Sequence, residues 1–412
     1  MVKVKPFFAL RPKEELVSKV AALPYDVMSS DEAREEVKDN PYSFLHIDKA
    51  EIDLDKSIDI YDERVYAKAK NNLEKFENYG IYINDNKKRY YFYRQIMNDH
   101  AQTGIVGCAS IDDYLENRIK KHEFTRADKE VDRIKHVNTC SAHTGPIFLA
   151  FKENHELESI IKEETEKTPL YDFVADDSVR HTVWESSDEV NLKIEEAFLK
   201  TDALYIADGH HRAASAVKVG VMKREENPNY TGDEEFNFFL SVIFPAKSLK
   251  ILDYNRLVKD LNGMSDEEFL KIVEEKIGTI TEYKDGAYRP TKKHEIGMYL
   301  NKKWYKVEFY NHICNANTPV KRLDCSILQD NLLLPILGID DPRSNKRIDF
   351  AGGIRGLSYL EKRCNEDMKL AISMYPTSLD DLMAVADSGD VMPPKSTWFE
   401  PKLRSGILIH KI

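Results

Sequence analysis

An acid, two imidazoles and a guanidinium follow one another near the middle of the chain, in the order Asp208, Gly209, His210, His211 and Arg212. A strand-like apolar run precedes them and small helix-forming residues follow, which places the group on a strand-to-helix turn. The glycine lets the backbone approach a ligand closely, and the N–H groups at a helix start favour an anion. Arg212 can contact a phosphate through two nitrogens. These residue types predict a phosphate-binding turn with an acid beside it.

Each reactive group of this turn has a role in phosphate chemistry. His210 or His211 can hydrogen-bond to a phosphate or move a proton. Asp208 can accept a proton from a hydroxyl or hold a magnesium ion. The alternative is an ordinary strand-to-helix turn whose histidines are merely solvated. We favour the functional interpretation, because starting a helix needs no more than one capping residue.

A second group of reactive side chains surrounds a predicted helix. His122 and Glu123 precede this helix, and Arg133 and His136 lie on it. These four residues would complement a phosphate and its metal ion, with Glu123 or Asp208 activating a hydroxyl. The alternative is a salt-bridged helical face in contact with water. A metal site of His122, His136 and Asp208 is a further interpretation, but the spacing is not diagnostic. The sequence thus leaves the metal ligands open, with Asp208 as one candidate.

The second group depends on the position and the orientation of its helix. Thr125, with an acid three positions later, resembles a capping box and predicts the start of the helix. The helix is expected to end near Cys140. Its apolar residues Ala127, Val131 and Ile134 are expected to form the buried stripe.

A third group lies in the tail of the chain. Pro393 and Pro394 stiffen the approach to Lys395, Ser396 and Thr397, which offer a cation and two hydroxyls. This arrangement suits a rigid loop that binds an anionic substrate. The alternative is a tail that merely closes the domain.

Strand-like and helix-like segments alternate along the chain without an internal repeat, which indicates an α/β or mixed α+β fold. The character of the sequence changes after the apolar run that ends at Phe244. We therefore expect two domains, with an uncertain boundary. Residues 1–245 would form an α/β domain that carries the Asp-Gly-His-His-Arg turn. Residues 246–412 would form an α+β domain whose proline-rich tail folds back on the site.

Composition excludes several classes of protein. The 412-residue chain has a formal net charge of -11, which argues against a DNA or RNA partner, because such proteins need a basic face. Five cysteines, an odd number without a close pair, suit reduced thiols in the cytoplasm. No signal peptide and no apolar run of membrane-spanning length is present, so we expect a cytoplasmic protein without a membrane partner. A P-loop, a Gly-x-Ser-x-Gly elbow and a His-Glu-x-x-His pair are also absent.

The central turn is similar to the Asp-Gly-x-His-Arg phosphate motif of the ParB/sulfiredoxin-like nucleotide-binding superfamily. That superfamily includes free serine kinases, which use ADP or ATP, and CTP-hydrolysing ParB proteins. Over its whole length the chain resembles the family filed as "domain of unknown function 1015". The blocks that carry this second resemblance are Leu23–Val27, Asn40–Phe44, Lys121–Thr125, Lys129–Arg133, Ala207–Arg212 and Met392–Lys402. The resemblance implies a ParB/sulfiredoxin-like core with added α+β elements, and a nucleotide partner.

Together these observations favour a phosphoryl-transfer enzyme that acts on a small metabolite. The preferred interpretation is a nucleotide-dependent kinase of a free hydroxy amino acid such as serine, using Mg²⁺ with ADP or ATP. The alternatives are a phosphohydrolase, for example of phosphoserine, and a non-catalytic nucleotide-sensing regulator. The acceptor, the phosphoryl donor and the oligomeric state stay open. The expected catalytic residues are Asp208, Glu123, His122 and His136. The expected phosphate- or nucleotide-binding residues are Gly209, His210, His211, Arg212, Arg133, Lys395, Ser396 and Thr397.

Overall fold

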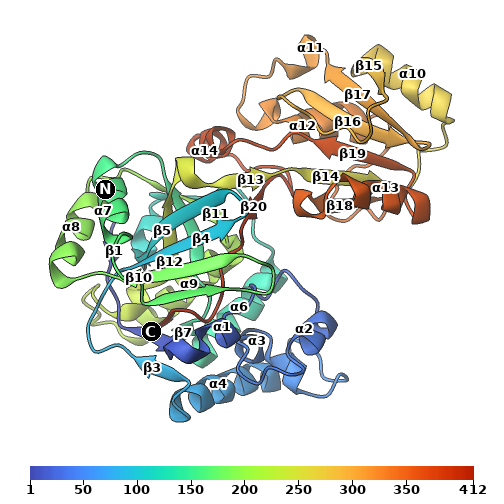
Figure 1. Cartoon of the computed structure of the whole chain (residues 1–412). Helices are drawn as coiled ribbons and strands as arrows, with labels where there is room; N and C mark the ends of the chain where they lie inside the picture. The colour runs from blue at the N-terminus through green and yellow to red at the C-terminus, as the bar shows by residue number, and fades with distance from the viewer. The chain divides into compact units, whose positions relative to one another are not determined.

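A computed structural model describes residues 1–412 and divides the chain into two compact units (Figure 1). The first unit contains Met1–Leu249 together with Pro401–Ile412, and the second contains Lys250–Glu400. The predicted mixed α/β class is confirmed. The sequence-based division placed all of residues 246–412 in a second domain, whereas in the structure the chain returns to the first unit after residue 400. None of the helices combines the length and the apolar character that crossing a membrane requires.

A nine-stranded sheet forms the centre of the first unit. Strand β1 (Val4–Lys5) pairs with β5 beside the main path of the sheet. That path runs β6 (Ile119–Lys120), β11 (Leu204–Asp208), β8 (Ile147–Phe151), β12 (Phe238–Pro245), β5 (His100–Ser110), β4 (Tyr91–Met97), β10 (Arg180–Glu185) and β9 (Tyr171–Val174). The pairs β11–β6 and β12–β8 are parallel and the others are antiparallel. Every residue of β8 and β12 is buried, as their continuous apolar runs require.

Helices pack on this sheet and on one another. They are α5 (Ile111–Leu115), α6 (Ala127–Cys140), α7 (His155–Glu164), α8 (Asp188–Phe198) and α9 (His210–Glu226). Helices α7 and α8 lie side by side (Figure 1), and α6 packs on α9. The core residues that α9 contributes include Ala213, Ala216 and Val217, which are small enough to keep this helix close to the strands. The start of α9 is therefore held firmly at the end of β11.

Helix α6 begins later than the sequence predicted. Its first residue is Ala127, and no side chain caps its N-terminus. The hydroxyl of Thr125 donates to the carboxylate of Glu130 instead of capping the helix. The predicted end at Cys140 is confirmed.

A smaller sheet and four helices make up the rest of the first unit. The sheet has the order β3 (Tyr82–Asn84), β2 (Ala9–Pro12), β21 (Ile409–Lys411) and β7 (Ala142–His143). The helices are α1 (Val17–Val20), α2 (Ser30–Glu36), α3 (Leu45–Asp48) and α4 (Glu63–Asn78). A second apolar core joins them, in which Ile409 of β21 packs with residues such as Leu10, Leu73 and Phe76. Because β21 is an inner strand, the C-terminal segment is an integral part of this unit.

The second unit is built on a six-stranded antiparallel sheet. Its order is β15 (Gly278–Tyr283), β17 (Lys303–Phe309), β16 (Glu295–Leu300), β19 (Leu370–Met374), β14 (Tyr254–Val258) and β18 (Ile348–Gly352). Strands β13 (Lys250–Leu252) and β20 (Trp398–Glu400) form a separate pair. The helices are α10 (Asp266–Lys276), α11 (Asn311–Cys314), α12 (Asp324–Leu328), α13 (Leu357–Glu366) and α14 (Leu379–Ser388).

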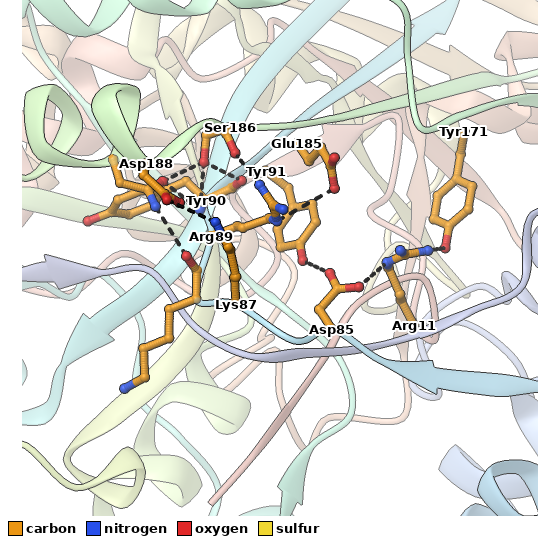
Figure 2. A network of polar contacts seen from close by, with 12 residues as sticks. Arg11, Asp85, Lys87, Arg89, Tyr90, Tyr91, Tyr171, Glu185, Ser186 and Asp188 are labelled. Atoms are coloured by element: carbon orange, nitrogen blue, oxygen red, sulfur yellow. Dashed lines mark hydrogen bonds and ion pairs between the residues drawn. The ribbon is translucent and has the colours of Figure 1, made fainter.

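A polar network connects the two sheets of the first unit (Figure 2). Arg11 of β2 donates from Nε to Asp85 at 2.8 Å and from Nη1 to the hydroxyl of Tyr171 at 2.9 Å. The hydroxyl of Tyr91, on β4, donates to the other oxygen of Asp85. The side chains of Arg11 and Asp85 are only 14% and 9% exposed, so each depends on the other for charge compensation.

Replacing Asp85 should test the importance of this network. We expect Asp85→Ala to lower the free energy of unfolding by about 3 kcal/mol, because Arg11 and Tyr91 would lose a buried acceptor. Urea unfolding followed by circular dichroism measures the change. Glu189→Ala is the matched control, because Glu189 is 79% exposed in its ion pair with Lys193, and it should leave the unfolding midpoint unchanged. Equal midpoints for the two variants would contradict a structural role for Asp85.

Candidate functional site

Helix α6 turns polar side chains towards the protein interior. Val131, which was predicted to be buried, is 53% exposed, whereas Asp132, Arg133 and His136 are only 7%, 8% and 2% exposed. Burying such groups costs free energy unless each one has a partner. The solvated-face interpretation of this helix is therefore wrong, and the face forms a wall of the interior instead.

The guanidinium of Arg133 is held in place by its neighbours. Its Nε donates to Asp132 at 2.9 Å, and Asp132 also accepts a hydrogen bond from the Tyr66 hydroxyl at 3.0 Å. The guanidinium carbon lies 4.0 Å from the centre of the Tyr25 ring. Neither Nη atom of Arg133 donates to another protein group. Arg133 is thus oriented by its inner nitrogen and keeps its outer nitrogens available.

The predicted turn adopts the expected geometry at the end of β11. Gly209 precedes α9 with φ +90°, a left-handed conformation that favours glycine. The carboxylate of Asp208 accepts from the Gly209 N–H at 2.8 Å through one oxygen and pairs with Lys402 Nζ at 2.9 Å through the other. Burial would raise the pKa of Asp208, but the charges of Lys402 and Arg212 outweigh it and hold this pKa well below its usual range. Asp208 is therefore a firmly ionised group that anchors its neighbours.

Two glycines leave room for the guanidinium of Arg212. A Cβ atom on Gly209 would lie 3.2 Å from the guanidinium carbon. A Cβ atom on Gly145 would lie 3.5 Å from Nη1 of Arg212 and 2.9 Å from the Ser405 hydroxyl. Nη1 donates to the carbonyl of Pro146 at 2.5 Å. The position of Arg212 is therefore fixed by the backbone on both sides.

Arg133 and Arg212 line the same pocket. The pocket is small, with a cavity volume of about 20 Å³. This space suits water or an oxyanion group, and it is too narrow for a nucleobase. The lining residues are Tyr25, Asp48, Arg133, His136, Val137, His143, Thr144, Gly145, Ile147, Arg212 and Ala216.

The polar groups of the pocket come from several parts of the first unit. Thr144 donates its hydroxyl to Asp48 at 2.7 Å, and both residues are buried. His136 directs Nε2 to the carbonyl of Ile47 at 3.0 Å, which places the proton on Nε2 and leaves Nδ1 as an acceptor. Sequence reasoning missed Asp48 and Thr144, because isolated polar residues on separate elements give no local pattern.

His122, Glu123 and His210 form a second group beside the same turn. The rings of His122 and His210 meet edge to face with their centres 4.4 Å apart. One oxygen of Glu123 lies 3.8 Å from Nδ1 of His210. His211 turns away and accepts a hydrogen bond from the Arg126 N–H at 3.0 Å. The turn thus separates an arginine side from a histidine side.

Burial lowers the pKa of each of the four predicted histidines. It brings the pKa of His122 to about 4 and holds that of His210 well below its usual range. The pKa values of His136 and His211 are lowered as well, with Arg133 adding to the effect of burial at His136. These imidazoles are therefore neutral near pH 7 and can accept hydrogen bonds or bind metal ions.

The three predicted tail residues belong to the second unit. The hydroxyl of Ser396 donates to the Pro393 carbonyl at 2.6 Å, which gives it a local structural role. The ammonium of Lys395 lies 5.6 Å from the centre of the Tyr254 ring, and Thr397 follows in the same segment. The tail residue that contacts Asp208 is Lys402, in the part of the tail that returns to the first unit. Lys402 stands in the most specific sequence block of the tail, but its single charge did not distinguish it from Lys395.

Most of the chain matches one known protein family. The model of a family described as "Protein of unknown function (DUF1015)" matches residues 4–326. No curated protein matches.

Several solved structures are similar to the chain at low sequence identity. C-terminally truncated SbnI from Staphylococcus aureus is 11% identical, with a TM-score of 0.38 over 72% of this chain and 82% of the other. Free serine kinase in complex with AMP is 15% identical, with a TM-score of 0.37 over 72% and 89%. A conserved hypothetical protein from Pyrococcus furiosus is 15% identical, with a TM-score of 0.35 over 73% and 93%. These TM-scores are too low to transfer an activity.

The neutral state of His136 predicts how stability depends on pH. Its pKa in the folded protein lies below the ordinary 6.5, so below pH 6.5 the unfolded chain binds a proton that the folded protein does not. Stability should therefore fall as the pH is lowered from 6.5 towards the folded pKa, by about 1.4 kcal/mol per pH unit for this one group. We expect His136→Gln to reduce the slope of unfolding free energy against pH in this window. Urea titrations at several pH values measure it. His155→Gln, whose side chain is 88% exposed, should keep the original slope, and an unchanged slope in His136→Gln would contradict the assignment.

Proposed function

The chain belongs to the DUF1015 family of proteins of unknown function, and for this member we propose a phosphoryl-transfer activity on a small metabolite. The preferred form is a nucleotide-dependent kinase of a free hydroxy amino acid such as serine, with ADP or ATP as the donor. The observation that carries the proposal is the convergence of Arg133 and Arg212 on one pocket beside the start of α9.

Two guanidiniums at one pocket favour an anionic ligand. Arg133 keeps both Nη atoms available, and Arg212 uses only Nη1, for the Pro146 carbonyl. Guanidinium groups bind phosphate through two parallel hydrogen bonds, and the repulsion between two cations is relieved when an anion binds between them. The N–H groups in the first turn of the 17-residue helix α9 add to this preference. In the proposal Arg133 and Arg212 hold the phosphates together with the backbone at Gly209, whereas His210 and His211 lie outside the lining of this pocket.

Glu123 is a better candidate than Asp208 for the general base that activates the acceptor hydroxyl. A general base works best when its pKa lies near the working pH. The pKa of Asp208 is held far below that range, and both of its oxygens already have partners. Asp208 would instead hold Lys402 beside the pocket, where an ammonium group offsets charge that develops during transfer.

The residues around Asp208 do not fit a magnesium ion. Mg²⁺ requires several oxygen ligands, usually carboxylates and phosphates. One oxygen of Asp208 is occupied by a backbone N–H and the other by Lys402, a cation that would repel the metal. We therefore assign no step to a metal bound by this carboxylate.

The activity itself can be tested on the purified full chain. We expect ADP or ATP to be consumed only when a hydroxy amino acid is present, with serine as the first acceptor to examine. Phosphorus NMR identifies the phosphorylated product. Phosphate release from phosphoserine without nucleotide would replace the kinase by a phosphohydrolase. Nucleotide binding without turnover for any acceptor would indicate a sensing protein.

Substitutions of Arg212 should test the pocket directly. We expect Arg212→Ala to weaken the binding of phosphate or ADP roughly ten- to a hundredfold, because a charged two-pronged contact is worth ~1.5–3 kcal/mol. Arg212→Lys should also bind more weakly, since an ammonium group cannot form the paired contact. Isothermal calorimetry measures the affinity. Arg180→Ala is the control, because Arg180 forms a surface ion pair with Asp172 and is 55% exposed. Unchanged affinity in folded Arg212→Ala would remove this turn from the site.

A further inference from the structure

A cluster of potential metal ligands lies on the histidine side of the turn. His122, Glu123 and His210 each offer one ligand atom, and these atoms lie within 4.8 Å of one another. His122 and Glu123 follow β6, and His210 begins α9. Because β6 and β11 are parallel neighbours in the sheet, the chain segments that follow them meet at the same edge. The cluster is thus positioned by the central sheet.

The buried imidazole of His122 is available to bind a ligand. The residue is 2% exposed, and neither ring nitrogen makes a hydrogen bond of acceptable geometry, although the backbone of Ile206 lies near the ring. Leaving a buried imidazole nitrogen unsatisfied costs free energy, and a bound ligand would compensate for that cost. The backbone N–H of His122 lies 3.5 Å from Nε2 of His210, at the outer limit of a hydrogen bond, and this contact does not fix the orientation of either ring.

We propose that His122, Glu123 and His210 bind a divalent transition-metal ion, with zinc as the best fit. Two imidazoles and one carboxylate form a common protein ligand set for catalytic zinc, in which the fourth position stays open for water or substrate. Imidazole nitrogens favour zinc and related ions over magnesium, which prefers oxygen ligands. With the ion bound, Glu123 would be a metal ligand and not the base that activates an acceptor hydroxyl, so binding of the ion does not depend on the proposed phosphoryl transfer.

The geometry requires only a small adjustment. Ligand atoms that share a zinc ion at ~2.0–2.2 Å lie roughly 3.3–3.6 Å apart at tetrahedral angles. The 3.8 Å separation between Glu123 and His210 is close to this value. Glu123 is 47% exposed, so its side chain can rotate without disturbing the core. The two histidines, in contrast, are held by burial and supply a rigid base for the site.

The charges around the cluster are compatible with a cation. The start of α9 and the ammonium of Lys402 both disfavour a positive ion. The carboxylate of Glu123 is a direct ligand in the proposal, and the carboxylate of Asp208 neutralises the ammonium of Lys402 at 2.9 Å. These two carboxylates thus offset the positive charges of the start of α9 and of Lys402.

Metal binding can be measured without any assay of activity. The full chain, stripped with a chelator, is titrated with Zn²⁺ by calorimetry in the absence of nucleotide. We expect one ion per chain, and X-ray absorption at the zinc edge should show two imidazole ligands. Failure to bind Zn²⁺, or equally tight binding of Mg²⁺, would overturn the proposal. Phosphate binding through Arg212 is measured separately, so the two proposals can fail independently.

Variants identify which residues hold the ion. Glu123→Gln should weaken Zn²⁺ binding at least tenfold, since it removes one of three ligands from an exposed position where the fold is unaffected. Glu123→His, which restores a ligand, should recover most of the affinity. Glu153→Gln is the control, because Glu153 is an exposed acid outside the cluster. Zn²⁺ affinity that is the same in Glu123→Gln, Glu153→Gln and the unaltered protein would exclude the cluster as the site.

Discussion

The ion pair between Asp208 and Lys402 joins three parts of the first unit at one point. Asp208 ends the buried strand β11, and through Gly209 it sets the start of α9. Lys402 comes from the segment that leads into β21. The pair lowers the pKa of Asp208 and keeps this acid ionised next to the guanidinium of Arg212. Without the pair, the half-buried carboxylate of Asp208 would lose its main counter-charge. The turn would also lose its ion pair with the C-terminal segment.

A second constraint is the inward orientation of polar groups on α6. Arg133 is buried, donates from Nε to Asp132 and stacks its guanidinium on the ring of Tyr25. These contacts provide only part of the hydrogen bonding that a guanidinium can make. Arg212, on the neighbouring helix, is half-buried and donates only from Nη1, to the Pro146 carbonyl. Proteins that bury cations without full pairing accept a loss of stability. In a pocket of this size, such a loss is readily explained by a ligand that completes the pairing.

The sequence was informative where chemistry is local. The turn from Asp208 to Arg212, the strand before it and the helix after it follow from residue type and spacing, and they were placed correctly. The buried face of α6 was predicted wrongly, because periodicity assigns apolar residues such as Val131 to the interior and cannot anticipate a polar interior. Asp48, Thr144 and Lys402 could not be connected to the turn, since their proximity arises only from long-range packing. Local signals therefore predicted the turn at the centre of the candidate site, and only tertiary structure supplied its surroundings.

The placement of β21 has a consequence for biosynthesis. The second unit, residues 250–400, is inserted into the first, so the ribosome completes it before the segment that contains Lys402 and β21 emerges. Until then the smaller sheet of the first unit lacks an inner strand, and Asp208 lacks its cation. Pairing β2 with β21 also closes a loop of nearly the whole chain, which is a slow step in folding. The smaller sheet therefore gains its inner strand, and Asp208 gains its cation, only after the inserted unit has been synthesised.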